Sequence, residues 1–395
     1  MNIPKWPRTD KMGEKYILDV LASNQWGATG IRWRKKSYET KFTNKFASYN
    51  NSPYCLTTLN GSTAIELALL ALGIRKGDKV LVTALTWVSC ATAILSVGAI
   101  PIFIDIDKSN LCMDIAKTKY ALKKYKKCKA ILLVHAYCSI APIEEFIKLT
   151  KKYKVHLIED CSQSHGAKYK NQLCGSFGVC GIFSMQSSKV LSSGEGGAII
   201  FQKQKYYTKA QKLRLDGRVP SNFPIGQTLV KTYNPISGRN RTITEFQHAL
   251  LLRGLELLDS ENSIRTKNAS YLGDILSQYN ISYFFQKSKK VLPSFYRFIY
   301  FFDKEKMYGN DIDEHIEYLV KNGIPAERVH IPIPLNRAIP KNLQKNKKFV
   351  KDNFPISLEI YNSCVTLAHQ CLLMDGVNIT ELSKYIIEDK VDNFE

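Results

Sequence analysis

The chain has 395 residues, of which 45% are hydrophobic and 23% are charged, and its formal net charge at pH 7 is +21. This composition is typical of a globular protein and excludes an intrinsically disordered chain. A chain of this length is expected to form two domains, or one large α/β domain with an appended lobe.

No part of the sequence predicts a membrane span or a signal peptide. The longest apolar stretch, residues 82–103, is interrupted by hydroxyl side chains such as Thr83 and Ser96, whereas a span needs about 20 predominantly apolar residues. Residues 1–16 lack the apolar core of a signal peptide. We therefore expect a soluble, cytoplasmic protein without a membrane partner.

The positive charge does not by itself predict nucleic-acid binding. The 56 basic residues comprise 43 Lys and 13 Arg, whereas base recognition and bidentate phosphate contacts favour arginine. The lysines are scattered over segments of helical pattern, such as 117–129 and 341–351, which is typical of solvated helix faces. We expect no specific nucleic-acid partner.

The ten cysteines are expected to be free and packed in the core. They contain no C-x-x-C pair and no zinc-finger spacing, and free cysteine packs well as a small buried residue. The sequence therefore predicts no metal site.

From about residue 53 the sequence alternates short apolar runs with amphipathic segments. The runs predict strands at 53–58, 79–82, 101–105, 130–135, 155–159, 181–184 and 197–201. The segments between them predict helices at 62–72, 87–97, 118–127 and 143–153. This alternation favours an α/β fold with a mostly parallel sheet covered on both faces, in which ligands bind at the carboxyl ends of the strands.

The pattern changes after about residue 204. A helix is predicted over 206–218, followed by a long loop over 219–241 that is rich in Pro, Asn, Gly and Ser. A further helix is predicted over 244–258, because Thr244 can cap it with Gln247 three positions later.

Beyond this helix, helix and strand signals mix with prolines, which predicts a smaller α+β lobe. We therefore predict a large domain over residues 1–255, with an N-terminal arm over about 1–20, and a small C-terminal domain over 256–395.

The segment from 155 to 201 contains the most informative residues. One predicted strand delivers Asp160 at its carboxyl end, and another delivers Ser184. Lys189 follows Ser184 by five positions, in a turn rich in Ser and Gln. A lysine held at the ligand edge of a parallel sheet is a candidate for Schiff-base chemistry, although a surface lysine remains the alternative from spacing alone.

Five segments together resemble the DegT/DnrJ/EryC1/StrS aminotransferase family. They are EDCSQSHGA (159–167), FSMQSSK (183–189), SGEGGAI (193–199), NGSTAIELAL (60–69) and LTWVSCATAI (85–94). The resemblance runs from about residue 15 to the end of the chain. It implies the fold type I, aspartate-aminotransferase-like fold, the cofactor pyridoxal 5'-phosphate (PLP, cycling with its amine form PMP), and a homodimer with shared active sites.

The resemblance assigns roles to two catalytic residues. Lys189 matches the lysine that carries the cofactor and moves a proton during the reaction. Asp160 matches the carboxylate that pairs with the pyridinium nitrogen and keeps it protonated.

Further residues match cofactor contacts of the family. Trp87 matches the aromatic stacked on the cofactor ring, and Gln163 matches a contact from the opposite side or to the phenolic oxygen. The predicted phosphate contacts are the backbone N–H groups of Thr63 and Ala64 at a helix start, the Ser184 hydroxyl, and Asn240 from the neighbouring subunit.

The sequence determines the substrate contacts less well than the cofactor contacts. Many relatives carry Tyr-Arg after the matched asparagine, whereas this chain has Arg241 and Thr242. We expect His165, Gln186 and His369 to be candidate substrate contacts, and a structural role is the alternative for each.

Segments KWPRTD (5–10) and SNQWGATG (23–30) are similar to those of glutamine-dependent inosose aminotransferases. The expected reaction is therefore amino transfer from L-glutamine, through PMP, to a keto-cyclitol or keto-sugar in natural-product or glycan biosynthesis.

Three alternatives remain at this point. The first is a nucleotide-diphosphate keto-sugar aminotransferase that uses L-glutamate. The second, a PLP-dependent sugar dehydratase, is disfavoured because Lys189 is intact. The third is a basic binding protein that retains the scaffold.

Overall fold

The computed structural model describes residues 1–27, 37–219, 231–232, 236–286 and 288–387. A central sheet of seven strands dominates the first part of the chain, with spatial order β1-β9-β8-β5-β4-β2-β3. The strands are β1 (Tyr54–Thr58), β2 (Lys79–Thr83), β3 (Ile100–Ile104), β4 (Cys128–Val134), β5 (His156–Asp160), β8 (Cys180–Ser184) and β9 (Gly197–Phe201). All neighbours pair in parallel except β9, which is antiparallel to both β1 and β8. The predicted mostly parallel sheet is confirmed.

Alternating side chains of the strands are buried on opposite faces of this sheet. In β2, Val80 and Val82 join one core cluster, whereas Leu81 joins another. Full burial of one such aliphatic side chain contributes about 1.5–3 kcal/mol, so both faces must be covered. The first face is covered by α3 (Gly61–Ala71), α4 (Ser89–Ser96) and α7 (Gln204–Arg214).

The opposite face is covered by α5 (Ile115–Lys124), α6 (Ile143–Tyr153), α2 (Tyr38–Tyr49) and the first half of α8 (Glu245–Gln278). The helix predicted at 143–153 is confirmed at both ends. The helix predicted over 206–218 ends earlier, at Arg214. Most of the loop predicted over 219–241 lies outside the described residues.

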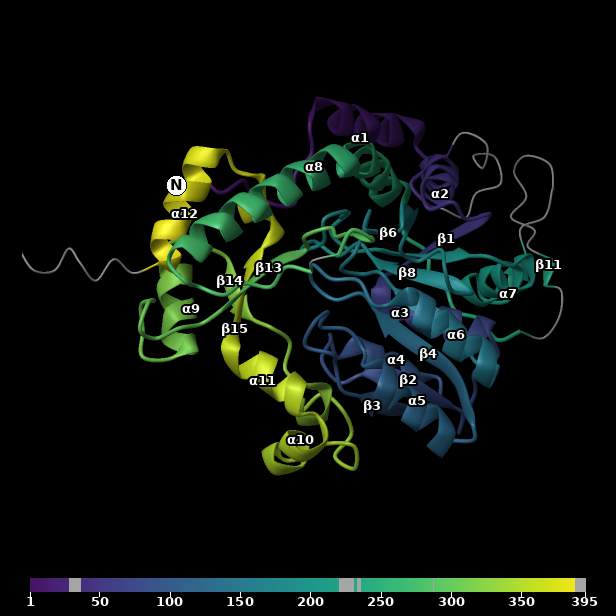
Figure 1. Ribbon diagram of the computed structural model, residues 1–395. Helices are drawn as coiled ribbons and strands as arrows, with labels where there is room; N and C mark the ends of the chain where they lie inside the picture. The colour runs from purple at the N-terminus through teal and green to yellow at the C-terminus, as the bar shows by residue number, and fades with distance from the viewer. Residues whose placement is uncertain (28–36, 220–230, 233–235, 287, 388–395) are drawn as a thin grey trace, which may run out of the picture.

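Helix α8 connects the large sheet to the smaller part of the chain and runs along the top of both in Figure 1. Thr244 and Gln247 form the predicted capping box at its start. The helix extends 20 residues beyond the predicted end at 258, to Gln278. The predicted domain boundary at 255 therefore falls inside a continuous helix, and the division at that position stays a prediction.

The smaller part is built on a three-stranded antiparallel sheet of order β13-β15-β14, at the left of Figure 1. Its strands are β13 (Arg297–Phe301), β14 (Ala326–Arg328) and β15 (Cys364–Ala368). Its helices are α9 (Ile312–Lys321), α10 (Lys347–Asn353), α11 (Pro355–Ser363) and α12 (Gly376–Ile386), with short 3-10 turns at Ile333–Leu335 and His369–Leu373. The remaining elements are α1 (Lys11–Ser23), β6 (Lys168–Tyr169), β7 (Gln172–Leu173), β10 (Arg218–Val219), β11 (Lys231–Thr232) and β12 (Val291–Leu292).

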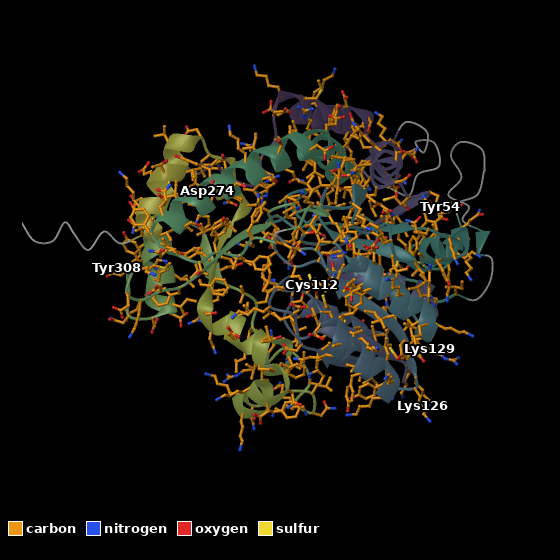
Figure 2. The ribbon with its side chains drawn as sticks, viewed as in Figure 1. Tyr54, Cys112, Lys126, Lys129, Asp274 and Tyr308 are labelled. Atoms are coloured by element: carbon orange, nitrogen blue, oxygen red, sulfur yellow. The ribbon has the colours of Figure 1, made fainter. Side chains whose placement is uncertain are left out.

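The cysteines are free and mostly buried, as the sequence predicts. All ten cysteines are free, and all are buried except Cys128, which is partly exposed. Lys126, just before β4, and Lys129, near the start of β4, lie at the periphery of the larger part of the chain (Figure 2). Within the described ranges, no helix is long and apolar enough to cross a membrane.

Candidate active site

Two of the predicted residues lie at the carboxyl ends of neighbouring parallel strands. Asp160 ends β5 and Ser184 ends β8, and these strands pair directly. The Asp160 side chain is only 3% exposed. One carboxylate oxygen accepts from the Ser162 N–H at 3.0 Å and the other from the Cys90 thiol at 3.2 Å. Because an ionised carboxylate can accept about four hydrogen bonds, Asp160 retains capacity for another donor.

Lys189 lies in a tight turn, and the side chain of Gln186 stabilises this turn by hydrogen bonds within it. Gln186 Oε1 accepts from the Ser188 N–H at 2.8 Å and from the Ser188 hydroxyl at 2.7 Å. The Lys189 N–H donates to the Gln186 carbonyl at 2.9 Å. We therefore assign Gln186 to positioning this turn, whereas the substrate role predicted for it gains no support from these contacts.

Tyr296, which precedes β13, is a site residue that the sequence analysis missed. The Lys189 Nζ lies 4.1 Å from the centre of its ring, and its hydroxyl lies 3.2 Å from that of Ser188. Burial raises the pKa of Tyr296, but the charges of Lys189 and Arg297 outweigh it and hold the pKa below its ordinary value. The aromatic face turned toward the lysine is favourable for a cation.

The N-terminus of α3 forms a cradle beside Ser184. A Cβ added to Gly61 would lie 2.8 Å from the Ser184 Cβ and 3.2 Å from its hydroxyl oxygen. Only a residue without a side chain therefore allows the first turn of α3 to approach β8 this closely. A helix N-terminus beside a hydroxyl group is suited to binding an anion.

The predicted backbone donors in this cradle need correction. Asn60 caps α3, with its side chain accepting from the Thr63 N–H at 2.8 Å and its carbonyl accepting from the Ala64 N–H at 3.0 Å. These two amide groups are therefore already hydrogen-bonded. Since a helix leaves its first amide groups unpaired, Gly61 and Ser62 are the better backbone candidates for an anion.

Trp87 and Gln163 differ sharply in exposure. Trp87, four positions beyond β2, is 58% exposed, although it follows a buried strand. Gln163 is 4% exposed, and its Oε1 accepts from the Tyr137 N–H at 2.8 Å. A large aromatic side chain left exposed is suited to stacking a flat ring.

His165 and His369 are both buried at 1% exposure, and neither ring has a hydrogen-bond partner among the described residues. Burial, with the charge of Lys189 adding to it, lowers the pKa of His165 to about 3. Burial likewise holds the pKa of His369 well below its ordinary value. Both imidazoles are therefore neutral at pH 7.

The structure places Asn240 at an exposed position within this chain. Its backbone bridges to Leu215, and its Oδ1 accepts from the Thr242 hydroxyl at 2.9 Å. Its predicted contact with a neighbouring subunit stays a prediction. Arg241 lies 3.5 Å from Glu66 of α3, so this segment runs close to the helix that forms the cradle.

A cluster of His135, Glu159 and Cys161 has donor types that could hold a metal ion. The Glu159 carboxylate, however, already accepts from the N–H groups of Gly175, Phe177 and Gly178, at 2.6–2.9 Å. It also lies 3.2 Å from the His135 ring. The hydrogen bonds account for the buried carboxylate, so we assign it to holding the 174–178 loop on β5.

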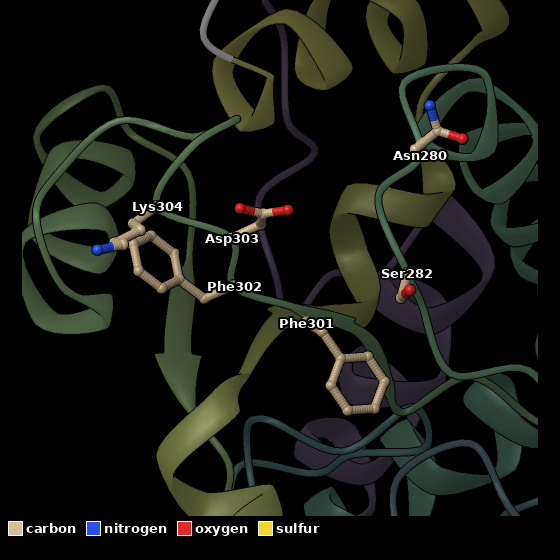
Figure 3. A pocket seen from close by; sticks show the side chains of 6 residues that line it. All are labelled: Asn280, Ser282, Phe301, Phe302, Asp303 and Lys304. Carbon is tan, nitrogen blue, oxygen red and sulfur yellow. The ribbon is translucent and has the colours of Figure 1, made fainter.

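A surface hollow of about 380 Å³ lies in the smaller part of the chain, away from these residues (Figure 3). Its lining comprises Asn280, Ser282, Phe301, Phe302, Asp303 and Lys304. Asp303 pairs with Lys306 at 2.9 Å, and Lys306 also donates to the Asn280 carbonyl. None of the predicted site residues lines it.

Solved structures of other proteins share this architecture. A 3-amino-5-hydroxybenzoic acid synthase superposes with a TM-score of 0.86 at 23% identity, covering 97% of both chains. A putative sugar aminotransferase, Spr1654 of Streptococcus pneumoniae, superposes in its PMP form with a TM-score of 0.84 at 21% identity, covering 97% of this chain and 98% of that one. The fold is therefore the α/β fold of PLP-dependent fold type I transferases that the sequence predicts.

Residues 9–379 match the DegT/DnrJ/EryC1/StrS aminotransferase family, and the chain belongs to that family. It is 31% identical over 388 residues to the L-glutamine:scyllo-inosose aminotransferase of Streptomyces griseus, covering 94% of this chain and 90% of the relative. It is 38% identical over 277 residues to the L-glutamine:2-deoxy-scyllo-inosose aminotransferase of Streptomyces paromomycinus, covering 69% and 65%. The protein is thus an aminotransferase, as its motifs predict.

Proposed function

We propose that this protein is a PLP-dependent aminotransferase that moves the amino group of L-glutamine to the keto group of a cyclitol. The observation that supports it best is the placement of Lys189 in a fixed turn directly after β8, beside the strand that ends in Asp160. Two relatives that share most of the chain are aminotransferases of L-glutamine and an inosose, as their names state.

The residues of the site fit the proposed cofactor. The Gly61–Ser184 cradle suits its phosphate, and the exposed face of Trp87 suits its ring. The buried carboxylate of Asp160 has capacity for the N–H of a pyridinium ring. The Lys189 amine, against the Tyr296 ring, would hold the cofactor at its aldehyde group. Bound there, PLP would supply an electron sink for the substrate carbon that bears the amino group.

The chain's own groups would perform the remaining tasks. The Lys189 Nζ would take the proton from the substrate carbon and return it during transfer. The Asp160 carboxylate would hold a positive charge at the ring nitrogen, in a buried position where such a pairing is strong. Trp87 would keep the ring plane fixed, so that the lysine meets the same face in each half-reaction.

The two neutral imidazoles near Lys189 suit a polyhydroxylated ring. His165 and His369 are buried and uncharged at pH 7, and each neutral imidazole offers one donor and one acceptor. Hydroxyl groups can satisfy both kinds of partner. This property agrees with a keto-cyclitol acceptor, such as the inososes of the relatives.

A homodimer in the cytoplasm completes the proposal. Asn240, exposed in the single chain, is then available to reach the phosphate of the neighbouring active site. This assignment rests on the family resemblance of the segment around Asn240.

The test is a pair of half-reactions on the protein reconstituted with PLP. L-glutamine should convert the bound cofactor to PMP, and scyllo-inosose or 2-deoxy-scyllo-inosose should then convert it back. Conversion by L-glutamate alone, followed by reaction only with a nucleotide-linked keto-sugar, would overturn the substrate assignment and favour the alternative.

A further inference from the structure

Three residues of the site close a ring of hydrogen bonds that the sequence did not reveal. The Tyr137 N–H donates to Gln163 Oε1 at 2.8 Å, and Gln163 Nε2 lies 3.1 Å from His330 Nε2. The backbone N–H of His330 in turn donates to the Tyr137 hydroxyl at 2.8 Å. Tyr137 follows β4, Gln163 follows β5, and His330 follows β14, so the smaller sheet contributes one member.

The ring fixes the hydrogen-bonding state of each member. Because the Tyr137 N–H can only donate, the oxygen of the Gln163 amide must face it and the NH₂ group must face His330. The NH₂ group can only donate, so His330 Nε2 must accept. The imidazole is therefore neutral, with its proton on Nδ1. Burial, together with the charges of Lys189 and Arg297, lowers the pKa of His330 to about 3, in agreement with this state.

The same histidine also contacts the aromatic side chains around it. Its ring lies 5.6 Å from that of Trp87 at an interplanar angle of 62°, and 5.3 Å from that of Tyr137. Tyr137 is buried and has a φ of 59°, a left-handed conformation that is uncommon for a residue with a side chain. Its N–H, hydroxyl and carbonyl are all bonded, the carbonyl to the Tyr296 N–H at 3.2 Å. These bonds hold the strained backbone in place.

We propose that His330 is a positioning residue, which aims the one remaining N–H of the Gln163 amide at the phenolic oxygen of the cofactor. The proposal rests on the proposed function, since that N–H has a target only when PLP is bound. Without an acceptor at this position the Gln163 NH₂ group would lose the partner that fixes its direction, while the Tyr137 N–H would still face the amide oxygen. His330, which follows β14 of the smaller sheet, would thereby orient the contact that Gln163, after β5 of the large sheet, makes with the cofactor.

The experiment measures the pH midpoint of the visible absorption band of the PLP-loaded protein. His330→Phe keeps a ring against Trp87 but removes the acceptor, and Gln163→Leu removes the donor. An N–H bonded to the phenolic oxygen favours its ionised form, so its loss should raise the midpoint by about one pH unit in either variant. The double variant should show no larger shift than either single one. His330→Gln, which restores an acceptor oxygen, should return the midpoint close to the wild-type value.

Each other outcome has a distinct meaning. An unchanged midpoint in His330→Phe, or additive shifts in the double variant, would overturn the positioning role. A merely structural role would lower the melting temperature of the cofactor-free protein and leave the midpoint unchanged. If the wild-type protein shows no Lys189-dependent band, the proposed function fails instead, independently of the His330 variants.

Discussion

The indole Nε1 of Trp6 donates a hydrogen bond to the carbonyl oxygen of Lys189 at 3.1 Å, across 183 positions of sequence. The Trp6 ring meets His369 edge-on, with 4.5 Å between centroids and 89° between planes. The guanidinium of Arg265 lies 5.6 Å from the centre of the indole. The N-terminal arm thus supports the lysine turn from outside, whereas Gln186 supports it from within.

Trp6→Phe should weaken this support while keeping most of the ring packing. Loss of one hydrogen bond should lower the free energy of unfolding by about 1 kcal/mol and slow amino transfer several-fold. Trp26→Phe is the matched control, because the Trp26 indole is 48% exposed and its Nε1 donates a long hydrogen bond of 3.4 Å to the Leu21 carbonyl. Urea unfolding and single-turnover rates check this, and equal effects of the two variants would contradict a role for Trp6.

Gly61→Ala should damage the predicted phosphate cradle. The added Cβ would lie 2.8 Å from the Ser184 Cβ, so α3 or β8 must shift, at a cost of about 1–3 kcal/mol in stability. The affinity for PLP should fall as well. Gly376→Ala is the control, because Gly376 also begins a helix, α12, and an added Cβ there meets nothing within 4 Å. A PLP affinity that survives Gly61→Ala unchanged would place the phosphate elsewhere.

Trp87→Ala should weaken PLP binding without destabilising the cofactor-free fold. The side chain is 58% exposed, so little packing is lost in the free protein. Aromatic stacking contributes about 0.5–1.5 kcal/mol, so the dissociation constant for PLP should be roughly 2- to 13-fold higher in the variant than in wild type. Trp87→Phe should retain most of the affinity, and Tyr120→Ala, at an exposed residue of α5, should retain all of it. Titration of the visible band measures each constant.

The contact between Asp10 and Arg253 should stabilise the arm at neutral pH. The hydrogen bond from Arg253, followed by that from the Gly13 N–H, lowers the pKa of Asp10 to about 2. Since the unfolded value is about 3.9, this contribution is complete above about pH 4 and is lost as the pH falls through about 2. Because the Asp10 side chain is 43% exposed, it should amount to no more than about 1 kcal/mol.

Asp10→Asn should therefore lower the melting temperature at pH 7, and the difference from wild type should narrow below pH 4. Asp375→Asn is the comparison, because the hydrogen bond from the Asn378 N–H lowers the pKa of Asp375 as well, so that it measures the narrowing that a helix cap produces by itself. A difference that stays constant from pH 7 to pH 3 would show that the Asp10 charge contributes nothing.

The central sheet could be predicted from sequence because its strands are short apolar runs separated by amphipathic helices. Helix α8 was underestimated for a physical reason. Its second half buries Glu261, Arg265 and Asn268, and these polar residues interrupt the apolar periodicity. Asn268 bonds the carbonyls of Leu372 and Met374, so its burial depends on a segment more than 100 positions away.

The candidate site, like helix α8, could be predicted only in part from the sequence. The positions of Asp160 and Ser184 at strand ends, and of Lys189 in the turn that follows, could be predicted because the two strands are recognisable. Tyr296 and His330 were missed, because their neighbours in space come from distant segments of the chain. The only local signal for His330 is its position in the proline-rich segment VHIPIP (329–334), which stops regular structure without indicating a contact.

The most direct test of the account is the visible absorption spectrum of the purified protein with PLP, compared between wild type and Lys189→Ala. Lys151→Ala, at an exposed lysine of α6, serves as the control. We expect wild type and control to show a visible band that bleaches on addition of L-glutamine. Lys189→Ala should lose this band, and its activity should fall by about 10³-fold or more. A band that persists unchanged without Lys189 would contradict the assignment of this lysine and the mechanism built on it.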